Sequence, residues 1–110
     1  MIRFHQEDLA KWNKRNFGEQ PSENFALGMA EEVGELCHYI LKRQQGIREG
    51  ASGNDLKDEI ADSFADAVIY GIALMDNEGL DAERVLEETI GKVLARDWKE
   101  SKFRKEESNV

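Results

Sequence analysis

Cysteine and proline are almost absent from this chain of 110 residues, which contains one of each, Cys37 and Pro21. A single cysteine excludes an internal disulfide and a thiolate metal cage, so we expect Cys37 to be a small buried apolar residue. No apolar run approaches the roughly 18 to 20 residues that span a bilayer, and the start, MIRFHQEDLAKW, lacks the apolar region of a signal peptide. We therefore expect a cytoplasmic protein with no membrane partner.

Basic residues are also scarce, with 15 Lys and Arg against 23 Asp and Glu, which gives a net charge of −8. This balance argues against a nucleic-acid partner, because no basic stripe is present to neutralise phosphates. An anionic ligand that arrives with a metal remains compatible, since a bound divalent cation reverses the local electrostatics. Length and composition predict one folded, helix-rich domain over residues 1–110, with a frayed charged tail from about 101 to 110.

Apolar residues recur with helical spacing in four segments, and no stretch has the period of two that is typical of strands. The predicted helices run from about Gln6 to Phe17, from Glu23 until Gly46, from Asp55 to Glu78, and from an N-cap at Asp81 through Val85, Leu86, Ile90, Val93 and Leu94 to Trp98. Between the second and third helices, GIREGASGN predicts a loop with a candidate N-cap at Asn54. Gly79 is a candidate left-handed cap. Short connections favour antiparallel neighbours, so the predicted fold is an all-α four-helix bundle.

Carboxylates accompany the apolar faces of the second and third helices. On the second helix the predicted core face contains Phe25, Met29, Val33, Leu36 and Ile40. Glu32 lies roughly 70° from the centre of this face and borders the core, with Glu35 beside it and Glu31 further out. On the third helix one sector about 60° wide contains four acids, because spacings of three, four and seven residues return to one face. They are Asp55, Glu59, Asp62 and Asp66.

Two features argue against an ordinary solvated face for these acids. The third helix continues into the uncharged run AVIYGIALM, 67–75, which predicts a helix that is buried all round. No lysine or arginine interleaves the acids, although like charges three and four apart are mildly destabilising without a counter-charge. A cluster of carboxylate oxygens favours Mg²⁺, or Mn²⁺ as a substitute, over zinc. The pattern therefore favours a site for a metal-bound polyphosphate, with a metal-polarised water as the nucleophile.

The same residues resemble a known signature. Glu31-Glu32-Val33-Gly34-Glu35, a spacer, and Glu59-Ile60-Ala61-Asp62 are similar to the EExxE…ExxD motif of the MazG-like all-α nucleoside triphosphate pyrophosphohydrolases. The similarity extends over most of the chain, through KWNKRNFGEQPSENFALGMAEEVGELCHYILKRQQGIR and GLDAERVLEETIGKVLARDWK.

This resemblance implies hydrolysis of a nucleoside triphosphate to the monophosphate and pyrophosphate, which would serve to clean the nucleotide pool. It implies magnesium held by Glu32, Glu35, Glu59 and Asp62, with Glu31 and Glu32 as catalytic candidates. It also implies a homodimer or a dimer of dimers. Counting back from Gly79, however, places the terminal aspartate of the motif at Asp66 and puts Ser63 at the usual glutamate position. The third-helix pair is therefore either Glu59 with Asp62 or Asp62 with Asp66.

Substrate-binding candidates lie on the first and last helices. The resemblance favours a base pocket made of Trp12, Asn16 and Phe17, although core packing explains the two aromatic residues equally well. Lys92 and Arg96 are four residues apart and would hold phosphates, or are ordinary surface cations. Tyr39 and Tyr70 flank the acids as ligand-orienting or core residues; the core interpretation is the stronger.

Two other functions fit parts of the sequence. Glu35-Leu36-Cys37-His38 has the Glu-x-x-His spacing of di-iron carboxylate bundles, but such a site needs the pair twice and the third helix has no histidine. An acidic helical interaction module without catalysis would dock basic partners through the same stripes. Docking of this kind would weaken smoothly with salt and need no metal, whereas nucleotide hydrolysis requires a divalent ion.

Overall fold

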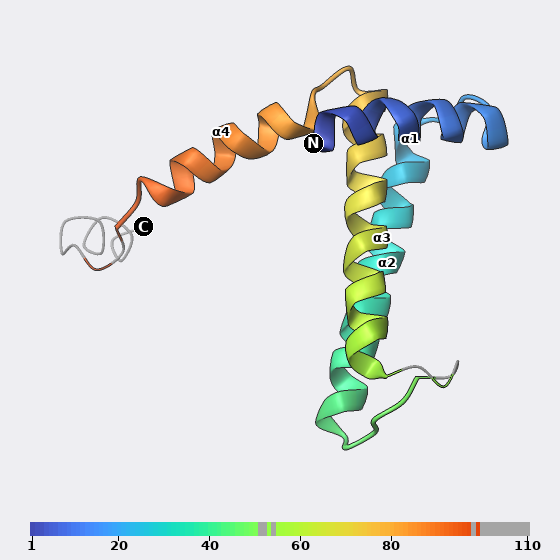
Figure 1. The fold of residues 1–110 in the computed structure, drawn as a ribbon, viewed down its shortest axis with the longest axis vertical. Helices are drawn as coiled ribbons and strands as arrows, with labels where there is room; N and C mark the ends of the chain where they lie inside the picture. Colours follow the sequence, from blue (N-terminus) through green and yellow to red (C-terminus); the bar gives the residue numbers. More distant parts are fainter. Residues whose placement is uncertain (51–52, 54, 98, 100–110) are drawn as a thin grey trace.

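The computed structural model describes residues 1–50, 53, 55–97 and 99 of the chain (Figure 1). It contains four helices, α1 (Ile2–Phe17), α2 (Ser22–Gln44), α3 (Leu56–Asn77) and α4 (Ala82–Leu94). No strand occurs among these residues, and the one β-bridge joins Glu49 to Asp55. The predicted all-α class with four helices is confirmed. Within the described part of the chain, no helix combines the length and apolar character needed to cross a membrane.

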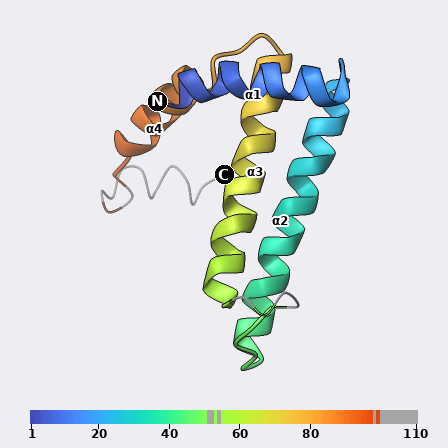
Figure 2. The ribbon, with the colours of Figure 1, turned by 45° about the vertical axis from the view of Figure 1, so that its right-hand side comes forward.

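An antiparallel hairpin of α2 and α3 forms the centre of the molecule (Figures 1 and 2). The two helices lie side by side over most of their length, and α1 lies across the end of the hairpin that contains the α1–α2 connection. Helix α4 contacts α1 and α3 and then leads away from the hairpin. One chain therefore leaves much of the hairpin and most of α4 without neighbours among the described residues.

The helix boundaries follow the capping signals in the sequence, with small differences. Asp81 caps α4 as predicted, since its carboxylate accepts hydrogen bonds from the backbone N–H groups of Glu83 and Arg84. Gly79 has φ +74°, the left-handed conformation predicted for the residue that ends α3. Asn54 lies outside the described residues, and Asp55 provides the N-cap of α3 by accepting from the Lys57 N–H. Helix α4 ends at Leu94, earlier than predicted, and Trp98 and residues 100–110 also lie outside the description.

A buried glutamine fixes α1 to the connection between α3 and α4. The Gln6 carboxamide nitrogen donates to Asp76 Oδ1 at 3.2 Å and to the Leu80 carbonyl at 2.9 Å, and its oxygen accepts from the Ala82 N–H at 2.8 Å. All the polar atoms of this buried side chain are therefore paired, as buried amides require. The first helix begins at Ile2, four residues before the predicted start, and so brings Arg3 to within 2.8 Å of Asp81.

The core of a single chain is small, and it corrects several predictions of burial. Phe25, Leu56, Ala67, Ile72 and Ala73 are buried between the helices, together with Ala82 and the polar Gln6 and Ser63. On α2, however, Met29 and Val33 are exposed because α3 covers only one side of the helix. Cys37 is exposed rather than buried for the same reason.

The uncharged run of α3 is likewise not buried all round. Ile69 is 41% exposed and Tyr70 37% exposed. Helix α2 covers one side of α3 and α1 crosses its end, so a single chain leaves the remaining surface of the run open.

Candidate functional site

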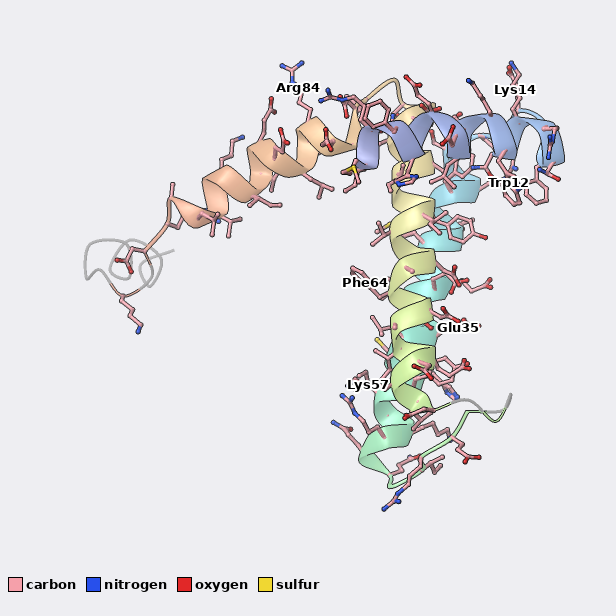
Figure 3. The ribbon with its side chains drawn as sticks, viewed as in Figure 1. Trp12, Lys14, Glu35, Lys57, Phe64 and Arg84 are labelled. Atoms are coloured by element: carbon pink, nitrogen blue, oxygen red, sulfur yellow. The ribbon has the colours of Figure 1, made fainter. Side chains whose placement is uncertain are left out.

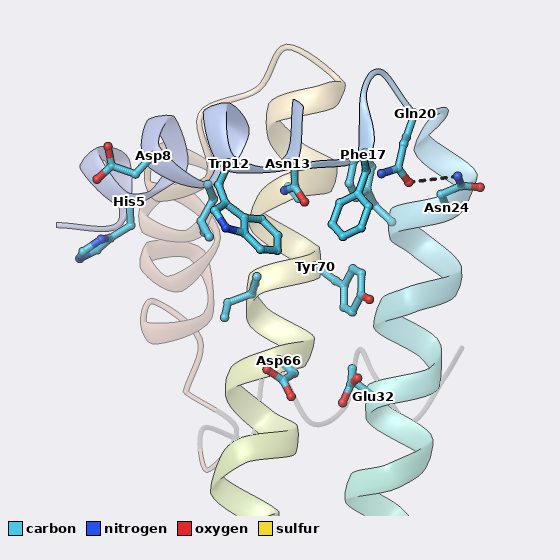
Figure 4. Close-up of a pocket in the computed structure, with 14 residues that line it drawn as sticks. His5, Asp8, Trp12, Asn13, Phe17, Gln20, Asn24, Glu32, Asp66 and Tyr70 are labelled. Carbon is cyan, nitrogen blue, oxygen red and sulfur yellow. Dashed lines mark hydrogen bonds between the residues drawn. The ribbon is translucent and has the colours of Figure 1, made fainter. Parts of the chain in front are cut away.

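A cavity of about 790 Å³ lies between α1, α2 and α3 (Figure 4). Helix α1 provides one end of it, and the hairpin provides the side walls and the other end. Its lining residues are His5, Asp8, Leu9, Trp12, Asn13, Phe17, Gln20, Asn24, Phe25, Glu32, Asp66, Ile69, Tyr70 and Ala73. Aromatic residues of α1 and two acids of the hairpin therefore face the same space.

The α1 end of the cavity is aromatic with a polar margin. Trp12 and Phe17 meet edge to face, with ring centroids 5.6 Å apart and an interplanar angle of 73°. Trp12 is half exposed, so its ring packs on Phe17 while one surface stays accessible. Asn13 lines the cavity beside them, and the Asn24 amide donates to Gln20 Oε1 at 3.1 Å. A flat ring with amides at its edge suits a planar heterocycle that carries hydrogen-bonding groups.

The opposite end is acidic, and Glu32 is its most constrained group. Glu32 Oε2 is buried and has no hydrogen-bond partner in the described structure. Burial, then the negative charges of Glu35 and Asp66, a hydrogen bond with Glu35 and the charge of Glu31 all raise the pKa of the Glu32 carboxyl. Figure 4 places Asp66 on α3 opposite Glu32 on α2. Helices α2 and α3 thus place Glu32, Glu35 and Asp66 close enough for their negative charges to repel one another.

About two helical turns further from α1 than Glu32 and Asp66, a tyrosine contacts the acidic stripe. The Tyr39 hydroxyl hydrogen-bonds the Glu59 carboxylate, and this bond, burial and the charges of Glu59, Glu35 and Glu32 raise the pKa of Tyr39. Gly50 of the loop lies against the same carboxylate, because a Cβ added there would stand 3.1 Å from Glu59 Cγ. The partly buried Glu59 therefore contacts Tyr39 and the loop, whereas Asp66 lines the cavity.

The antiparallel register of the hairpin aligns the two acidic segments. Glu32 lies opposite Asp66 and Tyr39 opposite Glu59. These pairs share one alignment, and with a rise of about 1.5 Å per residue it places Glu35 level with Ser63 and one residue from Asp62. Asp62 is exposed on the acidic side, while Ser63 is buried. Four acids, Glu32, Glu35, Asp62 and Asp66, thus occupy two adjacent turns of the hairpin.

Other predicted site residues lie elsewhere. Glu31 is exposed and acts on Glu32 only through its charge. The Asn16 amide donates to the Trp12 carbonyl of its own helix at 2.8 Å, and Asn16 does not line the cavity. Lys92 lies in the last turn of α4, and Arg96 lies beyond the end of that helix at Leu94. Because α4 leads away from the hairpin, neither cation reaches the cavity of its own chain (Figure 1).

Sequence reasoning missed Asn13 and treated Tyr70 mainly as a core residue. Asn13 lies four residues before Phe17, so the helical period could have placed both on one face. Tyr70 lines the cavity one turn from Asp66 because it continues the acidic stripe toward α1. His38 meets Tyr39 edge to face, with ring centroids 5.3 Å apart, and is exposed on α2.

The acidic side chains fit a hard divalent cation in their chemistry. As placed, no three His, Cys, Asp or Glu side chains among the described residues form a ready metal cage. Yet the donors are all oxygen, one of them is a buried carboxylate atom without a partner, and no Lys or Arg of the described chain pairs with Glu32, Glu35, Asp62 or Asp66. Such a donor set suits Mg²⁺ or Mn²⁺.

Comparison with known proteins identifies a family for this chain. Neither the curated proteins nor the solved structures searched gave a significant match. A family model, by contrast, matches residues 20–99, which include every acid of the hairpin but exclude Trp12 and Phe17 of α1. Since this match covers well over half of the sequence, the chain belongs to the family of the MazG nucleotide pyrophosphohydrolase domain.

Proposed function

We propose that the protein hydrolyses a nucleoside triphosphate, in the ribo or deoxy form, to the monophosphate and pyrophosphate in a Mg²⁺-dependent reaction. The observation that carries this proposal is the cavity itself, which joins an aromatic platform at one end to a cluster of carboxylates at the other. A nucleotide has the same polarity, with a flat base at one end and a phosphate chain at the other. Family membership supports the reaction class.

Carboxylates alone would repel the phosphate chain, so the proposal requires a cation between them. Glu32, Glu35, Asp62 and Asp66 would hold it, with Glu59 as the alternative donor if the third-helix pair is Glu59 with Asp62. When bound, the ion would neutralise phosphate charge and supply an activated water. The buried, unpartnered Glu32 Oε2 supports this role, because a buried acceptor without a donor is costly unless a ligand satisfies it.

The protein's own groups would orient the substrate. Trp12 and Phe17 would stack on the base, with Asn13 beside the ring edge. Glu31, the exposed neighbour of Glu32, is a catalytic candidate together with Glu32. Lys92 and Arg96 would contact phosphates only if α4 of another chain brought them to this cavity.

A panel of ribo- and deoxynucleoside triphosphates tests the function. Purified protein with Mg²⁺ is expected to produce one monophosphate and one pyrophosphate per triphosphate consumed, measured by ion-exchange chromatography. Chelation of the metal should stop turnover, and Mn²⁺ should restore it. Release of orthophosphate and a diphosphate would contradict the proposed cleavage position. Metal-independent binding of basic proteins that declines smoothly with salt, with no turnover, would favour an acidic interaction module instead.

We also propose that the working form is at least a homodimer. Phe64 is 61% exposed, and Figure 3 places it on the side of the hairpin opposite Glu35. Helix α4 exposes a second apolar face, formed by Leu86, Ile90 and Val93. Exposed apolar surface on both elements of one small chain is typical of an association surface. A second copy would cover it while leaving the acidic side open.

Light scattering coupled to gel filtration tests the assembly. The parent protein is expected to elute at twice the chain mass or a multiple of it, and Phe64→Glu is expected to shift the population to monomer because it buries a charge in the interface. Lys11→Glu on the exposed side of α1 is the matched control and should leave the mass unchanged. A parent protein that is monomeric and fully active would contradict the proposal.

A further inference from the structure

Tyr70 occupies the part of the cavity between its aromatic and acidic ends. Along α3 the residues that face the cavity are Asp66, Ile69, Tyr70 and Ala73, in order toward α1. Tyr70 lies one turn, about 6 Å, from Asp66. Figure 4 shows its ring between the level of Trp12 and Phe17 and the level of Asp66 and Glu32. A nucleotide that spans the two ends would place its sugar at this ring.

The middle of the cavity is apolar on the side formed by the hairpin. Ile69, Ala73 and Phe25 line it around the Tyr70 ring. Most polar lining residues belong to α1, to the α1–α2 connection or to the start of α2, and the others lie at the acidic end. The first group contains His5, Asp8, Asn13, Gln20 and Asn24, and the second contains Glu32 and Asp66. A sugar hydroxyl that faced Ile69, Ala73 and the Tyr70 ring would lose water without gaining a partner, which is unfavourable.

Gly28 holds the Tyr70 ring in this position. A Cβ added at Gly28 would stand 2.7 Å from Cδ1 and 2.7 Å from Cζ of Tyr70, and closer still to Cε1. These separations are far shorter than van der Waals contact, so any other residue at position 28 would force the ring to move. The ring therefore packs directly on the α2 backbone at a site that only glycine leaves open.

We propose that this contact between Gly28 and Tyr70 is a specificity element that selects a deoxyribonucleotide over the corresponding ribonucleotide. The inference rests on the proposed nucleotide function and adds the sugar to it. Tyr70 is a wall against the 2′ position rather than a group that takes part in the chemistry. An apolar wall that meets one additional hydroxyl discriminates by about tenfold to a hundredfold.

The experiment compares kcat/KM for dNTP and NTP pairs with the same base. We expect the parent protein to prefer the deoxy form by about tenfold or more. Gly28→Ala should reduce this ratio by at least about threefold and raise KM for the deoxy substrate, because the displaced ring no longer forms the wall. Gly34→Ala is the matched control. It adds the same methyl group to the same helix, and nothing lies within 4 Å of that methyl.

Variants at position 70 separate the ring from its hydroxyl. Tyr70→Phe keeps the wall and should keep the preference, whereas Tyr70→Ala should lose it. Adding Gly28→Ala to Tyr70→Ala should change nothing further, since the methyl group acts only by displacing the ring. Unchanged selectivity in Gly28→Ala, with a melting curve like that of Gly34→Ala, would overturn the inference.

Binding of α,β-imido deoxy- and ribonucleotides, measured by calorimetry, separates failure of the inference from failure of the proposed function. Equal hydrolysis of the ribo- and deoxynucleoside triphosphates would refute the inference and leave the function standing. Tighter binding of the deoxy analogue, by a protein that releases no pyrophosphate from the hydrolysable triphosphates, would refute the proposed reaction and support the role of Tyr70. Binding of neither analogue would refute both.

Discussion

Glu32→Gln is expected to reduce Mg²⁺-dependent pyrophosphate release by about a thousandfold. Glu32 contributes a buried carboxylate oxygen that has no hydrogen-bond partner among the described residues, and it lies opposite Asp66 across the hairpin. The amide is nearly the same size but supplies no charge to a cation and is a far weaker ligand. Loss of one preorganised electrostatic contact typically costs two to three orders of magnitude in turnover. A pyrophosphate-release assay across a range of Mg²⁺ concentrations measures the effect.

The same substitution should make the metal-free protein more stable. Burial and the neighbouring charges raise the pKa of Glu32, so the folded state binds its proton more tightly than the unfolded state does. The stability that this provides is complete below the ordinary glutamate range, near pH 4.3, and is lost as the pH rises through the raised pKa. Glutamine has no such loss. In chelator, the melting temperature of Glu32→Gln should therefore exceed that of the parent at pH 7 and approach it at pH 4.

Glu23→Gln controls for the removal of one negative charge from α2. Glu23 is exposed in the first turn of the helix, away from the cavity. Its variant should keep the activity of the parent. Full activity of Glu32→Gln with an unchanged Mg²⁺ requirement would remove Glu32 from the metal site. A variant that is both inactive and less stable than the parent in chelator would instead indicate a structural role.

The sequence predicts those features of the fold that depend on interactions between residues close together in the chain. The capping of α4 by Asp81 and the left-handed Gly79 after α3 were predictable because both depend on residues within one turn. The shared face of Glu59, Asp62 and Asp66 follows from the helical period alone. In contrast, the exposure of Cys37 and Ile69 depends on which surfaces the other helices leave uncovered. Hydrophobicity specifies that a surface needs a partner but not whether the same chain provides it.

The register of the hairpin also exceeded what periodicity could predict. The sequence places acids on α2 and on α3, but it does not say which residues are level. Packing decides this point, because Gly28 lets the Tyr70 ring approach the α2 backbone and thereby brings Glu32 opposite Asp66. The base pocket of Trp12, Asn16 and Phe17 stays a prediction. Trp12 and Phe17 line the cavity, whereas the Asn16 amide donates to the Trp12 carbonyl and Asn13 lines the cavity instead. Side-chain rotamers of exposed amides are not encoded by spacing.

Comparison of the three acids of α3 provides the second large effect. Asp62→Asn and Asp66→Asn are each expected to lose about a hundredfold to a thousandfold in Mg²⁺-dependent turnover, because the hairpin register places them on the turns that face Glu35 and Glu32. Glu59→Gln should lose less than about tenfold. Its carboxylate is engaged by Tyr39 and lies against Gly50, one turn further along α3.

Two further variants make the comparison decisive. Asp58→Asn removes a charge from the first turn of α3 outside the acidic stripe, and it should behave like the parent. Tyr39→Phe removes the hydrogen bond to Glu59. If the Tyr39–Glu59 pair only stabilises the loop, this variant should lose as little turnover as Glu59→Gln. If the family motif is instead read as Glu59 with Asp62, Glu59→Gln will be as damaging as Asp62→Asn, and Asp66→Asn will be mild. Asp62 belongs to both alignments, so an active Asp62→Asn variant with an unchanged Mg²⁺ requirement would contradict the metal site in either register.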